Sequence, residues 1–378
     1  KNEELSSPSI DEEENKIENE NSRNDVINNT KRVNIENNNI KGSLSLEGAI
    51  IDDIIFKNYK EELGGEKNVT FLNPRNSSKE YFIETGWASS GKENIKLPLL
   101  DTVWQVKGNS NLTPNNPVTL EWDNGENLIF TKKIELDDKF LFKITQSIKN
   151  NSNKSYQFYP YAQITKKEKP DGMKIYILHE GFLGVFGEEL KEEDYEDIDK
   201  EKFTISSSKG WLGITDKYWL TAIVPEKDKE FKAEFISKNK KYRANYIIKE
   251  ASILNPNGSI TNKIDAFVAA KEVHVIDNYA EKLNIEKFDL AIDWGWFYFF
   301  TKPLFFIIDY FFKLTGNFGW AIVIITALVR LIFFPLANYS FKSMAKMKIL
   351  QPEMLRLKEL HKGDKVKLQQ EMMALYKR

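Results

Sequence analysis

Residues 319–336 (GWAIVIITALVRLIFFPL) restrict the possible folds more than any other segment, because Arg330 is their only charged side chain. An α-helix rises about 1.5 Å per residue, so about 20 residues cross a hydrocarbon layer that is roughly 30 Å thick. Trp320 near one end and Tyr339 just past the other are residue types that favour membrane interfaces. The pattern predicts a transmembrane helix over residues 317–340, which would divide the chain between two aqueous compartments.

The charges of the chain are sorted toward its two ends, although 54 basic and 56 acidic residues leave a net charge of only −2. Residues 1–30 hold nine acids and three bases, a net −6, whereas residues 342–378 hold ten bases and four acids, a net +6. Segments with an excess of Lys and Arg stay on the cytoplasmic side of a membrane. We therefore expect residues 341–378 in the cytoplasm and residues 1–316 on the opposite side.

The acidic stretch 1–30 consists mostly of Asn, Glu, Asp, Ser and Lys. These residues offer too little apolar surface to offset the entropy that is lost on ordering, so the stretch is predicted to be a disordered linker. The chain opens with Lys1 and shows no signal peptide. We therefore expect it to be part of a longer protein.

Residues 31–282 alternate apolar and polar side chains in short runs that Asn and Gly interrupt. Alternation with a period of two, with turns about every ten residues, is typical of antiparallel strands in a sandwich or barrel. Helical spacing in 271–283 predicts a closing helix, and the acidic stretch 188–199 is expected to be a surface loop. The fold class is therefore mainly β, followed by membrane helices. Expected strands include 128–134, 140–148, 156–164, 218–224, 231–236, 244–248 and 265–268.

Residues 294–314 (WGWFYFFTKPLFFIIDYFFKL) are rich in aromatic side chains, but three charged residues recur among them at spacings of seven and four. Such residues share one helical face, which suits a helix in the membrane interface better than a spanning one, the alternative. Thr301, two residues before Pro303, is a candidate N-cap. The side chains assigned to this helix, in an interfacial region of residues 283–316, are Trp294, Trp296, Lys302, Asp309 and Lys313.

Residues 341–378 are predicted to form a helical hairpin. Helical spacing continues to about residue 361, Lys362-Gly363-Asp364 supplies a helix end and a new N-cap, and a second helix starts at residue 365. Five of the six methionines lie here, where unbranched thioethers either form an adaptable surface for varied helices or simply pack. The lysines could contact ribosomal RNA, anionic lipid or only solvent. The candidate contact residues are Met344, Met347, Lys346, Lys348, Met354, Met372 and Met373.

Arg330 is the strongest single functional signal. An arginine near the centre of a membrane helix costs about 2.5–3.5 kcal/mol on insertion scales and is usually tolerated where it faces a wet cavity or a partner. The alternative is a side chain that snorkels to the cytoplasmic face, with the span ending near Phe334. Because a guanidinium keeps its proton, we expect Arg330 to act electrostatically on acidic or polar groups that pass through a groove.

Little in the sequence points to the making or breaking of covalent bonds. The absence of cysteine excludes disulfides, thiolate metal sites and cysteine catalysis, and the three histidines lie too far apart for a local metal motif. His179 and Glu180 are the only adjacent imidazole and carboxylate, and they are not expected to be catalytic. We expect no catalytic residue, no metal site and no cofactor. The carboxylates that show no pairing motif are Asp101, Glu121, Asp123, Glu135, Asp171 and Asp216.

The C-terminal motifs resemble the YidC family of membrane protein insertases, in the form with a large periplasmic domain found in Gram-negative bacteria. They are SMAKMKILQPEM, QQEMMALYK and the arginine in ITALVRLIFFPL, all within residues 316–378. Weaker similarity runs through FDLAIDWGWFYFFTKPLFF, GWLGITDKYWLTAIVP and SLSLEGAIIDDI. The resemblance therefore covers about residues 40–378, without the acidic linker.

The resemblance implies a periplasmic β-supersandwich similar to mutarotase-like folds, an interfacial helix, and membrane helices around a hydrophilic groove open to cytoplasm and lipid. By motif, Arg330 corresponds to the groove arginine, residues 294–314 to the interfacial helix, and residues 343–378 to the first part of the cytoplasmic hairpin. The family inserts and folds inner-membrane proteins, alone or with the Sec translocon. It does so without an enzymatic reaction.

The resemblance also implies partners: nascent inner-membrane proteins, the Sec translocon with its accessory subunits, ribosome or targeting factors at the hairpin, and membrane lipid. Compared with the family, the chain is expected to lack the first and the last four membrane helices, and so to lack insertase activity by itself. Two other classes stay open. One is a single-pass periplasmic scaffold, and the other is a carbohydrate-binding or mutarotase-like protein that uses His179 or His274.

Overall fold

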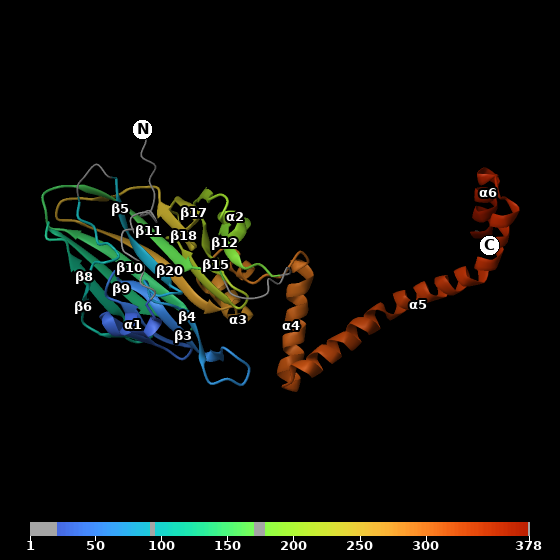
Figure 1. Ribbon diagram of the computed structural model, residues 1–378, viewed down its shortest axis with the longest axis horizontal. Coiled ribbons are helices and arrows are strands. Elements are labelled where there is room, and N and C mark those ends of the chain that lie inside the picture. Colours follow the sequence, from blue (N-terminus) through green and yellow to red (C-terminus); the bar gives the residue numbers. More distant parts are fainter. Residues whose placement is uncertain (1–20, 91–94, 170–177, 377–378) are drawn as a thin grey trace. The chain divides into compact units, whose positions relative to one another are not determined.

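The computed structural model describes residues 21–90, 95–169 and 178–376. It divides into two compact units, Lys1–Asp293 and Trp294–Arg378. The first is built from strands, which Figure 1 shows in blue to yellow, and the second is built from helices, shown in orange and red. The strand periodicity and the apolar segment of the sequence therefore predicted the correct kind of secondary structure in each part.

The first unit is a sandwich of two large sheets, in which neighbouring strands are antiparallel except for the short pair of β1 and β7. One sheet has eleven strands, in the order β14 (Phe203–Ser207), β17 (Phe231–Lys238), β18 (Lys241–Ile248), β11 (Tyr156–Lys167), β5 (Tyr81–Ser89), β3 (Ile50–Lys60), β2 (Ile40–Ser45), β1 (Arg32–Glu36) and β7 (Asn111–Leu112), with β19 (Ser252–Leu254) beside β11 and β4 (Asn68–Leu72) beside β3. The other has nine, in the order β13 (Glu189–Asp194), β12 (Gly181–Phe186), β15 (Gly210–Thr215), β16 (Trp219–Val224), β20 (Ser259–Ala270), β10 (Leu141–Asn150), β9 (Leu128–Leu136), β8 (Val118–Asp123) and β6 (Gln105–Lys107).

The apolar core lies between these sheets, because alternate side chains of each strand point inward. In β9, for example, Phe130 and Ile134 are buried, whereas the intervening Lys133 is exposed. Trp211 and Phe182 are fully buried in the same core. The alternation detected in the sequence is therefore the alternation between core and solvent.

Two polar side chains of the nine-stranded sheet also point into this core. Lys132 donates to the Thr85 carbonyl at 2.6 Å, and Gln146 donates to the Gly86 carbonyl at 3.0 Å. Both acceptors belong to β5 of the opposite sheet, and both donors are almost completely buried. Backbone carbonyls that a neighbouring strand does not pair still need a donor when they are buried. These two contacts therefore fix the alignment of one sheet on the other.

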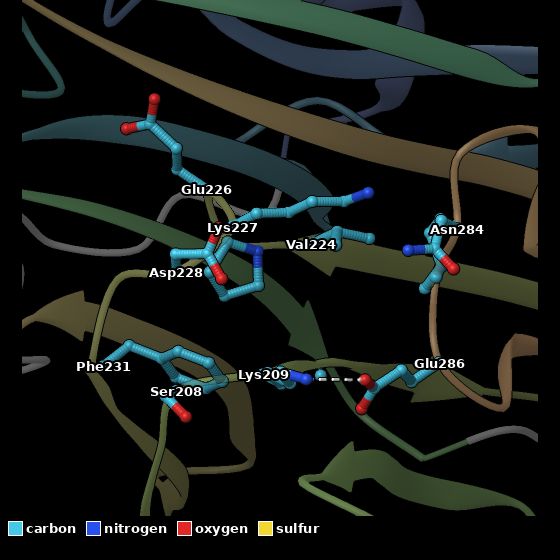
Figure 2. A pocket seen from close by; sticks show the side chains of 12 residues that line it. Ser208, Lys209, Val224, Glu226, Lys227, Asp228, Phe231, Asn284 and Glu286 are labelled. Carbon is cyan, nitrogen blue, oxygen red and sulfur yellow. Dashed lines mark hydrogen bonds and ion pairs between the residues drawn. The ribbon is translucent and has the colours of Figure 1, made fainter.

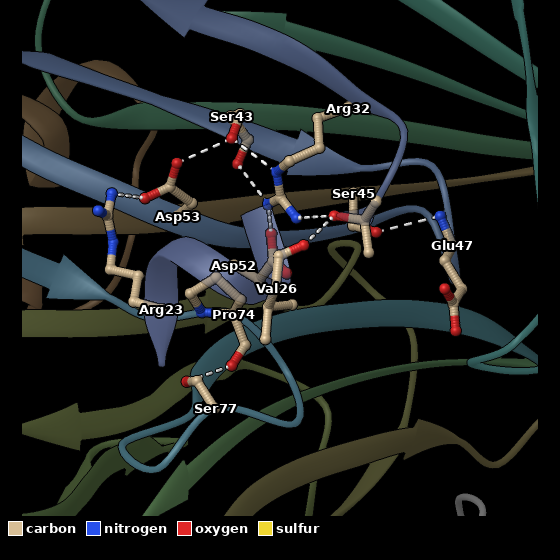
Figure 3. Close-up of polar contacts among 11 residues, drawn as sticks. Arg23, Val26, Arg32, Ser43, Ser45, Glu47, Asp52, Asp53, Pro74 and Ser77 are labelled. Carbon is tan, nitrogen blue, oxygen red and sulfur yellow. Dashed lines mark hydrogen bonds and ion pairs between the residues drawn. The ribbon is translucent and has the colours of Figure 1, made fainter. Parts of the chain in front are cut away.

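Two adjacent aspartates of β3, shown in Figure 3, form buried ion pairs. The register of β2 and β3 shifts between Ser43 and Leu44, so Asp52 is the extra residue of a β-bulge. Asp52 pairs with Arg32, and Asp53 pairs with Arg23 and accepts a hydrogen bond from Ser43 Oγ at 2.8 Å. The bulge therefore turns both carboxylates toward arginines.

The prediction of a disordered linker through residue 30 is wrong for its described C-terminal part, and residues 1–20 lie outside the described residues. Helix α1 (Arg23–Asn29) begins after Ser22, whose hydroxyl accepts the Asp25 N–H at 3.3 Å. The ion pair between Arg23 and Asp53 ties this helix to β3. Composition alone did not reveal these two interactions, because one is a local cap and the other is a long-range ion pair.

The expected surface loop at 188–199 is also wrong, since the segment forms β13 and the short helix α2 (Tyr195–Ile198). β13 pairs with β12 along its whole length, and Tyr195 and Ile198 are buried in the core. The many carboxylates line a sheet edge, where charged side chains discourage pairing with other chains.

The predicted closing helix is confirmed as α3 (Val273–Lys282). The first unit continues beyond the expected boundary at residue 282, as far as Asp293. Phe288 and Ala291 of the 3-10 helix η2 (Phe288–Ala291) are buried in the core, and the Trp211 indole donates to the Glu286 carbonyl at 3.2 Å. Residues 283–293 therefore belong to the sandwich rather than to the interfacial region.

The second unit contains α4 (Tyr298–Thr315), α5 (Phe318–Leu360) and α6 (Lys365–Tyr376). Gly316, with φ at 66°, ends α4, and Asn317 caps α5 by accepting the Gly319 N–H at 2.8 Å. α5 is the one helix among the described residues that is long and apolar enough to cross a membrane. The prediction of the spanning helix and of the helix that continues after it therefore agrees with the structure.

Candidate functional site

Arg330 lies in the apolar half of α5, on a face that α4 does not cover. The residues of α5 that are buried inside this unit are Ala321 and Ile325, near the turn from α4. A helix advances about 100° per residue, so Arg330 points roughly 180° away from Ala321 and roughly 140° away from Ile325. The Arg330 side chain is exposed, as are the apolar side chains around it. Its charge would therefore face whatever packs on the other side of α5.

Thr326 shares this face, one turn before Arg330, and the sequence reasoning overlooked it. Its hydroxyl donates to the Ile322 carbonyl at 2.8 Å. This bond uses the hydroxyl hydrogen and leaves the oxygen lone pairs exposed. The spacing of four residues from Arg330 was the signal in the sequence that could have identified it. Together these residues give α5 a polar strip on an otherwise apolar face.

α4 begins at Tyr298, so Trp294 and Trp296 precede the helix rather than belonging to it. The intervening Gly295, with φ at 70°, interrupts the helical backbone. The prediction that Thr301 is the N-cap is also wrong, because its hydroxyl lies inside the helix and donates to the Trp294 carbonyl at 2.8 Å.

The predicted charged stripe of α4 shows two kinds of contact. Lys313 pairs with Asp309 one turn earlier, at 2.7 Å. Lys302 lies 5.7 Å above the ring centroid of Trp294 and 5.8 Å above that of Tyr298. Many aromatic side chains of the segment are exposed, including Trp296 and Phe299. Charged groups beside exposed aromatics are typical of a helix in the membrane interface.

The hairpin has the predicted form, with a turn at Gly363 and Asp364 accepting the Lys367 N–H at 3.1 Å. The structure separates the methionines into two groups. Met354 and Met372 are half-buried, and the Tyr376 hydroxyl donates to the Met354 sulfur at 3.7 Å. The other candidate contact residues, which are exposed, are Met344, Met347, Met373, Lys346 and Lys348. This second group is therefore the more accessible to a partner.

The structure places the histidine and carboxylate candidates of the sandwich in structural contacts. The Nε2 of His179 lies 2.8 Å from the Phe182 carbonyl, and its Nδ1 lies 3.3 Å from Asp194. Glu180 accepts the backbone N–H of Lys217 at 3.0 Å. His274 is exposed on α3. The two histidines therefore lie in different settings, one bound on both ring nitrogens and the other on a helix surface.

Three of the other carboxylates are held by lysines: Glu121 by Lys107 at 3.1 Å, Glu135 by Lys133 at 2.8 Å, and Asp216 by Lys166 at 2.6 Å. Asp123 accepts the Gly125 N–H at 2.8 Å, Asp101 is exposed, and Asp171 lies outside the described residues. Among the described residues, no group of three His, Asp or Glu side chains is arranged to hold a metal ion.

A cavity of about 190 Å³, shown in Figure 2, opens where the β14–β15 turn meets the segment after α3. Both signs of charge line it, and Lys209 pairs with Glu286 across it at 3.3 Å. Glu226 accepts a hydrogen bond from Asn262 at 3.0 Å. These internal pairings account for much of its polar lining, so the cavity does not define a ligand class.

The chain thus combines a large β-sandwich with an apolar helix that can cross a membrane and carries a charged side chain. This is the class of an anchored membrane protein with a folded extramembrane domain. A family model described as the YidC periplasmic domain matches residues 32–307, and one described as 60Kd inner membrane protein matches residues 310–378. The chain belongs to the YidC family of inner-membrane proteins.

Two relatives show how much of the family's length the chain represents. It is 55% identical over 373 residues to a Pelagibacter ubique protein named membrane protein insertase YidC, covering 98% of this chain and 66% of that protein. It is 41% identical over 373 residues to the protein of the same name from Methylorubrum extorquens, covering 94% of this chain and 60% of that protein. The chain thus spans less than two thirds of the length of these relatives.

Solved structures with a similar arrangement include a galactose mutarotase-like protein from Clostridium acetobutylicum, with a TM-score of 0.43 and 11% identity, covering 64% of this chain and 96% of that one. A putative aldose 1-epimerase from Escherichia coli K12 gives a TM-score of 0.41 and 9% identity, covering 64% of this chain and 99% of that one.

Proposed function

We propose that this chain provides the periplasmic domain and one polar groove wall of an insertase for inner-membrane proteins. The observation that carries the proposal is Arg330, a charge in the membrane-spanning helix that points away from α4. The names of the relatives state the same function, and the family models match both parts of the chain. The remaining walls of the groove would come from helices that pack on the face of α5 that carries Thr326 and Arg330.

The physical role of Arg330 in this function is to lower the barrier for polar segments that cross the membrane. Placing an aspartate at the centre of a membrane helix costs about 2.5–3.5 kcal/mol on insertion scales. A guanidinium in a low-dielectric groove attracts such a carboxylate more strongly than it would in water. Once the polar segment has passed, each apolar CH₂ group of the substrate that moves into lipid contributes about 0.8 kcal/mol. The process requires no covalent chemistry and no nucleotide.

The hairpin would meet the substrate first, on the cytoplasmic side. Its exposed methionines, Met344, Met347 and Met373, form a flexible apolar surface, while Lys346 and Lys348 add positive charge. Such a surface suits nascent hydrophobic helices, and the lysines suit ribosomal RNA, targeting factors or anionic lipid. We propose the Sec translocon as a further partner, on the basis of the family resemblance alone.

Replacing Arg330 by Ala in the complete gene product should lower insertion of a small inner-membrane protein with an acidic translocated tail about tenfold, equivalent to ~1.4 kcal/mol. Proteoliposomes and protease protection of the tail would measure the inserted fraction. Arg330→Lys should keep most of the activity, because it keeps the charge. The matched control is Leu331→Ala, at the neighbouring exposed position of α5.

Insertion by Arg330→Ala at the unaltered rate, in a protein that still reaches the membrane, would contradict the groove role. The chain would then be better described as a membrane-anchored scaffold, with the sandwich as its binding part. A loss of the same size in Leu331→Ala would show that the effect comes from helix packing rather than from charge, and it would also count against the proposal.

A further inference from the structure

The sequence contains two Asn-Gly pairs, and both lie in turns of the sandwich. Asn124-Gly125 lies between β8 and β9, and Asn257-Gly258 lies between β19 and β20. Asparagine and glycine are frequent in turns because both tolerate positive φ, and Asn257 has φ at 55°. The proposed function uses neither turn. Because the dipeptide is the same in both, the comparison rests on what surrounds each pair.

An Asn-Gly pair can change covalently without an enzyme. The backbone nitrogen of the glycine attacks the side-chain carbonyl carbon of the asparagine and forms a C–N bond. The N–H proton leaves with the side-chain NH₂ group as ammonia, and a five-membered succinimide remains. Water then opens this ring at either carbonyl, which gives aspartate or isoaspartate. The attack is intramolecular and is therefore fast where the two groups can meet, and glycine has no side chain to crowd the attacking nitrogen.

The carboxamide of Asn124 is buried and held in place. Asn124 is 3% exposed, and its side-chain oxygen accepts the N–H groups of Glu126 at 2.7 Å and Leu128 at 3.1 Å. Its side-chain nitrogen donates to the Lys96 carbonyl at 3.3 Å. These hydrogen bonds have to break before the side-chain carbonyl carbon can turn toward the Gly125 nitrogen. The reactive conformation of this pair is therefore rare in the folded sandwich.

The carboxamide of Asn257 is exposed to solvent, and no hydrogen bond to it is found in the described part of the chain. The backbone of the turn is held, since the Asn257 N–H donates to the Ser152 carbonyl at 3.3 Å. The side chain can therefore rotate while the turn keeps its shape. Water, which opens the succinimide, also has access at this position.

The two glycine nitrogens that would attack lie in similar settings. The Gly125 N–H donates to the Asp123 carboxylate at 2.8 Å, and the Gly258 N–H donates to the Asn255 carbonyl at 3.0 Å. Each nitrogen must give up one hydrogen bond in order to react. The difference between the two pairs therefore lies in the asparagine side chains, one of which is held and the other free.

We propose that Asn257 is a site of spontaneous deamidation in the folded extramembrane domain, whereas Asn124 is protected. The product is a mixture of aspartate and isoaspartate at residue 257. Isoaspartate lengthens the main chain by one CH₂ group in a turn that packs on Asn150. The Asn150 side chain donates to the Asn255 carbonyl at 3.0 Å, and its N–H donates to the Gly258 carbonyl at 2.9 Å. The modification therefore alters the start of β20, separately from insertion.

Incubation of the purified chain in detergent, in a mildly alkaline buffer, followed by peptide mass spectrometry, tests the proposal. Trypsin releases the two sites in separate peptides, residues 108–132 and 250–263. In the folded chain Asn257 should convert at least about tenfold faster than Asn124, because the hydrogen bonds of the Asn124 side chain must open first. In urea, where both turns are unfolded, the two asparagines should convert at similar rates.

Gly258→Ala should slow the conversion of Asn257 severalfold, because its methyl group crowds the attacking nitrogen. Gly65→Ala is the matched control and should leave this conversion unchanged. A Cβ at Gly65 would lie 3.2 Å from a backbone carbonyl oxygen, and a Cβ at Gly258 would lie 3.1 Å from one, so the two substitutions are equally tight. An isoaspartyl methyltransferase, which methylates the isoaspartate carboxylate with S-adenosylmethionine, should label the incubated chain but not Asn257→Gly.

Equal rates at Asn257 and Asn124 in the folded chain would overturn the proposal, because the surroundings would then have no effect. Conversion of Asn257 only after unfolding in urea would overturn it as well. If Gly258→Ala and Gly65→Ala change the rate equally, the reaction does not proceed through the Gly258 nitrogen, and the assigned chemistry is wrong.

Discussion

Replacing Arg32 by Met should destabilise the sandwich by about 3–5 kcal/mol at neutral pH, because it leaves the Asp52 carboxylate buried without its counter-ion. The Arg32 and Asp52 side chains are 7% and 2% exposed. Arg32 also donates to Ser43 Oγ at 2.7 Å and to the Ser43 carbonyl at 3.3 Å. Methionine keeps much of the side-chain volume, so the loss would come mainly from charge and hydrogen bonding.

The effect should depend on pH in a defined direction. Burial raises the pKa of Asp52 from 3.8 to about 6 even with Arg32 present. The folded state therefore binds more protons than the unfolded state between these values, and stability falls by ~3 kcal/mol as the pH rises from about 4 to about 6. Without Arg32 the folded-state pKa would rise further, so the variant should lose more stability at pH 7 than at pH 4.

Urea unfolding of the chain in detergent, followed by the β-sheet circular dichroism signal, would measure these losses. The double variant Arg32→Met, Asp52→Asn should recover most of the stability, because it removes the unpaired charge. The control is Arg23→Met, which breaks the neighbouring pair with Asp53 but affects an arginine that is 26% exposed. If Arg32→Met is no more destabilising than Arg23→Met, the deeper burial of the Arg32–Asp52 pair does not increase the cost of losing the arginine.

Replacing Lys132 by Met should remove a large pH dependence of stability in the alkaline range. Lys132 is fully buried, donates to the Thr85 carbonyl and lies 5.1 Å above the ring centroid of Trp104. Burial lowers its pKa from 10.5 to about 8. Between these values the unfolded state binds more protons, so the unaltered sandwich gains up to ~3 kcal/mol as the pH rises through this window.

The difference in unfolding free energy between the unaltered chain and Lys132→Met should therefore change by up to ~3 kcal/mol between pH 7.5 and pH 10.5. The same urea experiment at several pH values measures it. Lys133→Met is the matched control, because Lys133 is the next residue of β9 but is 45% exposed and pairs with Glu135. Parallel pH profiles for the two variants would show that burial does not lower the pKa of Lys132.

The local patterns of the chain predicted much of the fold. Alternation along β9 and β10 follows core and solvent, and helical spacing in 271–283 corresponds to α3. The apolar segment around Arg330 corresponds to the first half of α5. Such patterns can be recognised in the sequence because each face of a strand or helix contacts a single environment. The errors occurred at α1 and at the acidic stretch 188–199, where long-range contacts outweigh composition.

The candidate sites likewise divide into those that the sequence reveals and those that only the structure reveals. Arg330 was evident because one charge in an apolar helix is conspicuous, and its position relative to α4 needed only helical geometry. Thr326 was missed because one threonine among apolar residues is unremarkable until its face is known. The cavity shown in Figure 2 could not be predicted, since its walls come from the β14–β15 turn, the β16–β17 turn and the segment after α3, far apart in the chain.

The sequence by itself determined how the chain divides between water and lipid, because transfer free energies are properties of side chains and add along a segment. It also determined which residues of each strand face the core. Only the tertiary structure decided that Lys132 donates to a carbonyl of the opposite sheet and that Arg32 pairs with Asp52. Whether a polar group is paired depends on the positions of atoms from distant segments, and only folding brings those atoms together.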